Sequence, residues 1–146
     1  MELGNSSQTT GKEPVPGGYG TVLMVEDEQS LREPVAKILR RRGFTIIETP
    51  DGLAAIDQYR ARSHEIAVVL LDITLPVLSG AEVMARLEEI RPDVKIILTS
   101  AYSEESVIET LGGRRPWAYV RKPYSPNELA DLLYVACTRR LSAGYP

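Results

Sequence analysis

Residues 67–80 read AVVLLDITLPVLSG and join an unbroken apolar run to a carboxylate. Such an apolar run is typical of a strand that is buried on both faces, as the strands of a parallel sheet are. Asp72 closes the strand, and the turn-forming residues Pro76 and Gly80 mark the loop that follows. The apolar positions beyond this loop share one face of a helix: Val83, Leu87 and Ile90. The stretch therefore predicts a strand, a loop and a helix, with an acidic side chain at the end of the strand.

The same alternation of strand and helix runs through the rest of the chain from Thr21 onward. Short apolar runs predict four further strands, at 21–25, 44–49, 94–100 and 117–123. Apolar residues at helical spacing predict helices before Gly43, at 53–62, at 104–111 and from about Ser125. Five strands that alternate with five helices indicate an α/β fold, in which right-handed crossovers place helices on both faces of a parallel sheet.

Length and composition are those of one globular domain. The chain has 146 residues, of which 43% are hydrophobic and 25% are charged, and its net charge is −3. This charge gives no indication of a nucleic-acid-binding surface, and no run of about 18 apolar residues predicts a membrane span. Cys137 is the only cysteine, which excludes an internal disulfide. We therefore expect a cytoplasmic domain that binds neither nucleic acid nor membrane.

The two ends of the chain differ from its centre. Residues 1–20 are rich in Gly, Ser, Thr and Pro and lack apolar periodicity, so we expect a flexible linker or an expression remnant there. No internal repeat is visible in the remaining sequence. We place the domain at 21–142 and a short tail at 143–146.

Polar side chains follow four of the predicted strands. The strands end, in order, in Glu26-Asp27-Glu28, in Asp72, in Thr99-Ser100 and in Arg121-Lys122-Pro123. Ligands of an open α/β sheet bind beyond the carboxyl ends of its strands, so these side chains should converge. Neighbouring carboxylates repel each other unless a cation lies between them, and Mg²⁺ with oxygen ligands is the usual solution. Asp27 and Asp72 would bind Mg²⁺ directly, with a backbone carbonyl of the loop after Asp72, and Glu26 directly or through water.

A metal ion beside an exposed carboxylate is typical of phosphoryl transfer. Asp72 is the better nucleophile because the central strand delivers it to the middle of the cluster, and carboxylates do form aspartyl phosphates. Lys122 offers a point charge for one phosphoryl oxygen, and the hydroxyl of Ser100 a hydrogen bond for another. Thr99 competes with Ser100 for this role, but strand alternation points the two side chains to opposite faces. Only one of them can therefore serve.

These residues resemble a known family, the receiver domains of two-component response regulators. The likeness extends over about residues 21–140 and lies in four motifs, VLMVEDE (22–28), VVLLDITLPVLSG (68–80), IILTSAY (96–102) and YVRKPY (119–124). The resemblance implies a flavodoxin-like, doubly wound sheet in the order 2-1-3-4-5, with a turn at Gly80. It also implies Mg²⁺, for which Mn²⁺ can substitute, held by Glu26, Asp27, Asp72 and the carbonyl of Thr74.

The resemblance further implies what the site does. A histidine kinase or a histidine phosphotransfer domain would donate the phosphoryl group of a phosphohistidine to Asp72. The isolated domain would turn over no external substrate and would only phosphorylate and dephosphorylate itself. The Lys122–Pro123 peptide would be cis. The switch would be Ser100, which its spacing to Lys122 favours over Thr99, together with Tyr119.

Other functions fit the pattern less well. A haloacid-dehalogenase-type phosphatase would need a second aspartate two residues after the nucleophile, where this chain has Thr74. A flavodoxin would bind phosphate after the first strand, where residues 26–28 would repel it. A receiver-like interaction module that is never phosphorylated stays open as an alternative, although every expected site residue is present.

The context of the domain is suggested by its start. The segment GGYGTVLMVEDE (17–28), after a polar linker, resembles receivers at the C-terminus of hybrid sensor histidine kinases. A stand-alone regulator is the alternative. Two features depart from the family's pattern. Pro34 falls in the first turns of a helix, where proline is tolerated only near the N-terminus, and residues 112–116, GGRRP, replace a short turn, so we expect the fourth helix to be short or mobile.

Overall fold

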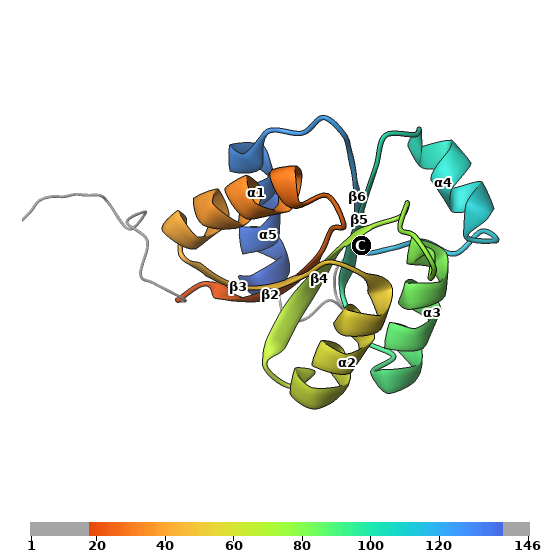
Figure 1. Cartoon of the computed structure of the whole chain (residues 1–146), viewed down its shortest axis with the longest axis horizontal. Helices are drawn as coiled ribbons and strands as arrows, with labels where there is room; N and C mark the ends of the chain where they lie inside the picture. The colour runs from red at the N-terminus through yellow and green to blue at the C-terminus, as the bar shows by residue number, and fades with distance from the viewer. Residues whose placement is uncertain (1–17, 139–146) are drawn as a thin grey trace, which may run out of the picture.

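Strands and helices alternate along the part of the chain that the structure describes (Figure 1). The computed structural model describes residues 18–138, so residues 1–17 and 139–146, with most of the predicted linker and all of the predicted tail, lie outside it. The strands are β2 (Gly20–Val25), β3 (Phe44–Thr49), β4 (Ile66–Asp72), β5 (Ile96–Ser100) and β6 (Ala118–Arg121). The helices are α1 (Gln29–Arg41), α2 (Gly52–Arg62), α3 (Gly80–Ile90), α4 (Glu104–Thr110) and α5 (Pro126–Thr138).

The strands form one parallel sheet in the order β3-β2-β4-β5-β6. Counted along the chain, this order is 2-1-3-4-5, which confirms the flavodoxin-like, doubly wound fold. Figure 1 shows α1 and α5 on one face of the sheet, and α2, α3 and α4 on the other. Because β4 is the central strand, Asp72 at its end comes to the middle of the edge where the strands end.

Each face of the sheet has its own core, because successive side chains of a strand point to opposite faces. In β2, Leu23 and Val25 pack with residues of α2 and α3, whereas Val22 and Met24 pack with residues of α1 and α5. All four side chains are at most 1% exposed. The apolar run in β2 is therefore buried on both faces, and the strand holds the residues that follow it on a rigid support.

Two strands are shorter than the sequence predicts. The run 94–100 is a strand only from Ile96, the residue at which β5 begins to pair with β4. The run 117–123 is a strand only over Ala118–Arg121, because β6 lies at the edge of the sheet and pairs with β5 alone. Local hydrophobicity does not report where a pairing partner begins and ends.

Two residues that the sequence analysis assigned to the linker take part in the fold. Strand β2 begins at Gly20, and the ring of Tyr19 packs edge-on against Phe44, with centroids 5.6 Å apart, and against Tyr134, at 5.0 Å. Tyr19 thus contacts both β3 and α5.

The two unusual segments have local explanations. Pro34 lies inside α1 but near its N-terminal end, and it is exposed, so the helix continues past it. Helix α4 is short, with 7 residues, and it is followed by Gly112 and Gly113, which have positive φ angles of 69° and 86°. Arg114 forms an ion pair with Glu88, so the segment after α4 is bound to α3. Within residues 18–138, no helix is both long and apolar enough to cross a membrane.

Candidate functional site

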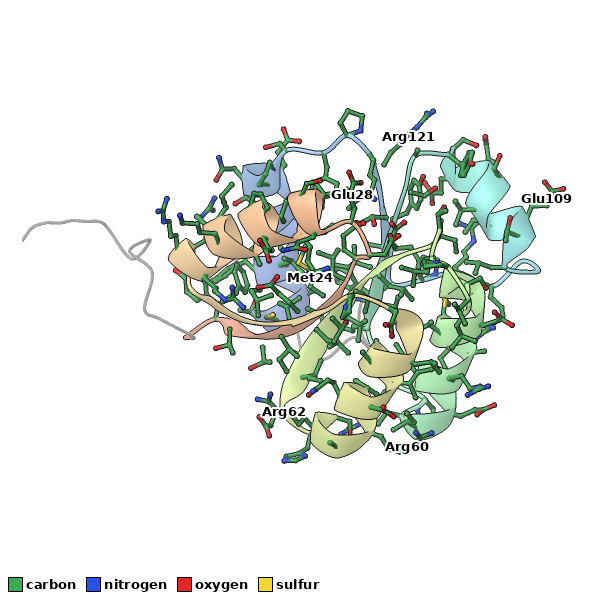
Figure 2. The ribbon with its side chains drawn as sticks, viewed as in Figure 1. Met24, Glu28, Arg60, Arg62, Glu109 and Arg121 are labelled. Carbon is green, nitrogen blue, oxygen red and sulfur yellow. The ribbon has the colours of Figure 1, made fainter. Side chains whose placement is uncertain are left out.

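Three carboxylates meet at the edge where β2 and β4 end. One carboxylate oxygen each from Glu26, Asp27 and Asp72 lies within 4.8 Å of the others. Glu26 and Asp72 are buried, with exposed fractions of 4% and 5%, whereas Asp27 is exposed. The three acids named from the sequence therefore come together, with one of them open to solvent. Figure 2 places Glu28 at this edge, and Arg62 at the opposite edge of the molecule.

Lys122, which follows β6, reaches two of these acids. Its Nζ donates to Oε1 of Glu26 at 3.0 Å and to Oδ2 of Asp72 at 3.1 Å. Burial by itself lowers the pKa of Lys122, but the hydrogen bonds to Glu26 and Asp72 outweigh it and raise the pKa above its ordinary value. The ammonium group is therefore charged at neutral pH. The peptide bond between Lys122 and Pro123 is cis.

The pKa of Glu26 is raised, and burial is the largest cause. The hydrogen bond from Lys122 opposes that effect, and the nearby charge of Asp72 adds to it. The repulsion between carboxylates that the sequence suggested is thus present, and removal of Glu26 from water is the larger cause. A cation bound between these oxygens would favour the ionised form, so the cluster suits a hard divalent ion.

The loop after β4 folds back over the end of its own strand. The amide of Thr74 donates to Oδ1 of Asp72 at 3.1 Å, whereas Lys122 binds the other oxygen, Oδ2, of the same carboxylate. Further along, the amide of Gly80 donates to the carbonyl of Ile73 at 3.0 Å. A Cβ at position 80 would lie 2.5 Å from Cα of Ile73, so only glycine allows this close approach.

The hydroxyl residues at the end of β5 are both buried. Thr99 pairs with Asp72 in the register of β4 and β5, and Ser100 is the last residue of the strand. The Oγ of Ser100 accepts a hydrogen bond from the amide of Tyr102 at 2.9 Å, and the carbonyl of Ser100 accepts one from the amide of Lys122 at 2.8 Å. Ser100 is thus hydrogen-bonded both to the loop beyond β5 and to the backbone of Lys122.

Tyr119 lies apart from the acids and contacts the loop beyond β5 instead. Its hydroxyl donates to the carbonyl of Tyr102 and lies 3.5 Å from the carbonyl of Ser100. Its ring packs against the core beneath α3 and α4. The structure therefore links Tyr119 to the segment that carries Ser100, and not to Glu26, Asp72 or Lys122.

Two further residues near the site were given no role in the sequence analysis. Arg32, on α1, donates from Nη1 to the carbonyl oxygen of Glu26 at 3.0 Å. Tyr124 is partly buried beside the cis peptide, and burial, with the charge of Glu26 next in size, raises the pKa of Tyr124 to about 12. Arg32 reads in the sequence as an ordinary polar position of an amphipathic helix, so only the folded chain reveals its contact.

The comparisons with known proteins agree with this arrangement. The family model of the response regulator receiver domain matches residues 22–134. Sensory transduction protein RegX3 of Mycobacterium tuberculosis is 40% identical over 111 residues, which are 75% of this chain and 47% of that protein. Sensor kinase CckA of Brucella abortus is 31% identical over 113 residues, 77% of this chain and 12% of that protein. The chain thus spans less than half the length of either relative.

Solved structures share the fold. A response regulator receiver domain from Clostridium thermocellum superposes with a TM-score of 0.75 at 19% identity, over 82% of this chain and 95% of that one. A CheX–CheY–BeF₃–Mg²⁺ complex from Borrelia burgdorferi gives a TM-score of 0.70 at 26% identity, over 80% and 86% of the two chains. With its fold, its converging acids and these matches, the chain belongs to the response regulator receiver domains of two-component signalling.

Proposed function

We propose that this receiver domain accepts a phosphoryl group on Asp72 in a reaction that depends on Mg²⁺. One observation carries the proposal: the oxygens of Glu26, Asp27 and Asp72 converge, and the ammonium group of Lys122 bridges two of them. A ring of carboxylates beside a fixed cation provides both a nucleophile and the positive charge that a phosphoryl group requires.

The donor set supports a hard divalent ion. Glu26, Asp27 and Asp72 offer only oxygen ligands, and the carbonyl of Thr74 would complete the protein's contribution. Mg²⁺, or Mn²⁺ in its place, would offset the negative charge that otherwise keeps a phosphoryl group away from the acids. The Borrelia burgdorferi neighbour is described as a complex with BeF₃ and Mg²⁺, which supports the same pair of ligands here.

In the proposed step, a carboxylate oxygen of Asp72 attacks the phosphorus of a phosphohistidine. The bond from phosphorus to the imidazole nitrogen breaks as the new bond from phosphorus to oxygen forms, and the leaving imidazole takes up a proton from water. The carboxylate of Asp72 is held in place by Thr74 on one oxygen and by Lys122 on the other. Lys122 would then pair with a phosphoryl oxygen in place of the carboxylate oxygen that it holds now.

The signal would pass through Ser100 and Tyr119. The hydroxyl of Ser100 would give up its hydrogen bond from the amide of Tyr102 and donate instead to a phosphoryl oxygen. The hydroxyl of Tyr119 is bonded to the same short loop, so a movement of Ser100 would alter the contact of Tyr119. A phosphoryl group shifts such an equilibrium only by its difference in affinity for the two states.

The donor would be a histidine kinase or a histidine phosphotransfer domain. Relatives of this chain include a protein named as a sensor kinase and others named as sensory transduction or transcriptional regulatory proteins. We propose a receiver at 21–142 that belongs either to a hybrid kinase or to a separate regulator. The single cysteine, Cys137, suits the reducing cytoplasm in which this exchange would take place.

Acetyl phosphate with Mg²⁺ tests the proposal directly, with intact mass as the readout. We expect a gain of one phosphoryl group that EDTA prevents and that Asp72→Asn abolishes. Asp57→Asn, which removes an exposed carboxyl on α2, is the matched control and should leave the gain unchanged. A gain that survives Asp72→Asn would mean that another carboxylate is the acceptor. No gain with acetyl phosphate or with a phosphorylated histidine kinase would favour the interaction module that is never phosphorylated.

A further inference from the structure

Arg32 connects helix α1 to the loop that carries the acids of the site. Its Nη1 donates to the carbonyl oxygen of Glu26 at 3.0 Å, and its Nε lies 3.3 Å from Oε1 of Glu48, near the end of β3. The side chain of Arg32 is 13% exposed and that of Glu48 24%. A guanidinium group with so little access to water is held stably only where its N–H groups have partners. Both partners fix its position.

The carbonyl that Arg32 binds lies between two acids of the site, Glu26 and Asp27. Strand β2 ends at Val25, and the amide of Glu26 still donates to the carbonyl of Thr49 at 3.1 Å. The carbonyl of Glu26 lies beyond the hydrogen bonds of the sheet and accepts one from Arg32. It belongs to the planar peptide unit that joins Glu26 to Asp27. Without that contact, the backbone torsions on either side of the unit, ψ of Glu26 and φ of Asp27, would be less restricted, and with them the directions of the two acid side chains.

We propose that Arg32 is a positioning residue for the divalent-ion site. By holding the peptide between Glu26 and Asp27, it keeps both carboxylates directed at Asp72. Glu48 orients the guanidinium group and offsets its charge. This inference rests on the proposed function, because it assigns Arg32 to the Mg²⁺ site described there.

The sign of the effect separates positioning from simple electrostatics. Arg32 is a cation close to a site for another cation, so its charge alone repels Mg²⁺. If charge were its only influence, replacement by a neutral side chain would tighten Mg²⁺ binding. If Arg32 holds the peptide of the site, the same replacement weakens binding because the carboxylates lose their common direction.

Arg40 provides a matched control on the same helix. Its Nη1 lies 2.9 Å from Oε2 of Glu48, and its Nη2 donates to the carbonyl of Ile46 at 2.8 Å. It therefore shares with Arg32 its charge, its helix and its acidic partner, and it also binds a backbone carbonyl. That carbonyl lies in β3 and belongs to no residue of the site.

The experiment titrates Mg²⁺ by calorimetry into the parent protein, Arg32→Gln and Arg40→Gln. Partners that orient metal ligands typically change affinity by 10–100-fold, so we expect Arg32→Gln to raise the Kd about tenfold. Arg40→Gln should leave the Kd within about twofold of the parent. Thermal unfolding without metal runs in parallel. Arg32→Lys keeps the charge but lacks the planar fork that reaches both partners, so it should also weaken binding.

Several results would overturn the inference. An unchanged Kd in Arg32→Gln would leave Arg32 with no effect on the metal site, and a tighter Kd would leave it with an electrostatic effect alone. Equal weakening in Arg32→Gln and Arg40→Gln would point to a general loosening of α1. If Arg32→Gln does not fold, Glu48→Gln serves instead, because it keeps an acceptor for Arg32 and should raise the Kd by a smaller factor; an unchanged Kd there would count against the inference. A parent protein without Mg²⁺ binding would refute the proposed function, and the inference with it.

Discussion

Burial acts in opposite directions on the pKa values of Glu26 and Lys122, since it raises the first and lowers the second. Burial raises the pKa of Glu26, because the ionised carboxyl lacks water, while the hydrogen bonds from Lys122 to Glu26 and Asp72 raise the pKa of Lys122 against the effect of burial. A raised pKa in the folded chain means that folding is favoured by the protonated form of that group. For Glu26, the stabilising contribution is therefore present at acid pH and is lost as the pH rises through its folded pKa.

This linkage predicts the behaviour of Glu26→Gln, which mimics the protonated carboxyl. At neutral pH without divalent ions, the variant should have a higher free energy of unfolding than the parent, and the gain should shrink towards about pH 4, where the parent carboxyl also becomes protonated. Urea unfolding at both pH values measures the difference. Added Mg²⁺ should reverse the order, because binding requires the charged carboxylate. A less stable variant at neutral pH would mean that the Lys122 pair outweighs burial.

The loop between β4 and α3 depends on a single small residue. A Cβ at Gly80 would lie 2.5 Å from Cα of Ile73 and 2.7 Å from the carbonyl oxygen of Asp72, and both are backbone atoms that cannot move alone. We expect Gly80→Ala to lower the free energy of unfolding by about 1–3 kcal/mol, as overpacking does. It should also slow phosphorylation by acetyl phosphate, because Asp72 belongs to the displaced backbone.

Gly52→Ala is the comparison for that loop. A Cβ at position 52 would lie 2.5 Å from a methyl group of Val83, a side chain and not a backbone atom. We expect Gly52→Ala to lower the free energy of unfolding less than Gly80→Ala does, because the side chain of Val83 can repack. The phosphorylation rate should change little. Equal loss of rate in both variants, measured at matched fractions of folded protein, would show that the contact at Gly80 has no special relation to Asp72.

The strands and helices of this fold can be predicted from local sequence, but the residues at which the strands begin and end cannot. Apolar runs identify the strands because a doubly covered parallel sheet leaves no polar face, and Asp72 stands out because it interrupts such a run. The start of β5 at Ile96 depends on pairing with β4, which no local pattern encodes. The acids and Lys122 could be predicted because they follow strands that end at one edge. The contacts of Arg32 could not, because its partners Glu26 and Glu48 come from two other segments of the chain.

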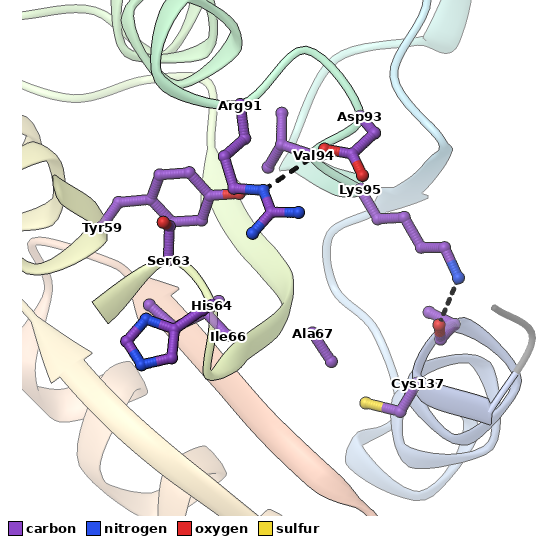
Figure 3. A pocket seen from close by; sticks show the side chains of 11 residues that line it. Tyr59, Ser63, His64, Ile66, Ala67, Arg91, Asp93, Val94, Lys95 and Cys137 are labelled. Atoms are coloured by element: carbon purple, nitrogen blue, oxygen red, sulfur yellow. Dashed lines mark hydrogen bonds and ion pairs between the residues drawn. The ribbon is translucent and has the colours of Figure 1, made fainter. Parts of the chain in front are cut away.

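At the scale of the whole molecule, the two ends of the sheet, where its strands finish and where they start, differ in character. The edge where the strands end carries the acids, and the opposite edge has a cavity of about 250 Å³ between the end of α2, the turn before β5 and α5. Figure 3 shows Tyr59 extending from α2 towards Arg91, with His64 and Cys137 on other sides of the cavity. Tyr59 is 2% exposed, and its hydroxyl has no hydrogen-bond partner among residues 18–138.

A buried hydroxyl without a protein partner should contribute nothing to stability. Burial raises the pKa of Tyr59 to about 12, so the hydroxyl stays neutral and only its hydrogen bonding matters. We expect Tyr59→Phe to leave the free energy of unfolding unchanged or to raise it by up to about 1 kcal/mol, because a desolvated hydroxyl is removed. Urea unfolding measures this. A loss of more than about 1 kcal/mol would reveal a hydrogen bond, through a water molecule held in the cavity.

The close contact between Gly20 and Cys137 makes the chain's single thiol a natural reporter. A Cβ at Gly20 would lie 2.9 Å from Sγ of Cys137, so the first residue of β2 lies against the sulfur atom, and burial raises the pKa of the thiol to about 11. Cys137 is partly exposed beside the cavity, and a protonated thiol reacts slowly with alkylating reagents, so its labelling rate depends on how closely α5 lies against the sheet. With one cysteine in 146 residues, no other thiol contributes to the signal. If phosphorylation loosens or tightens α5, the thiol would record it without any added probe.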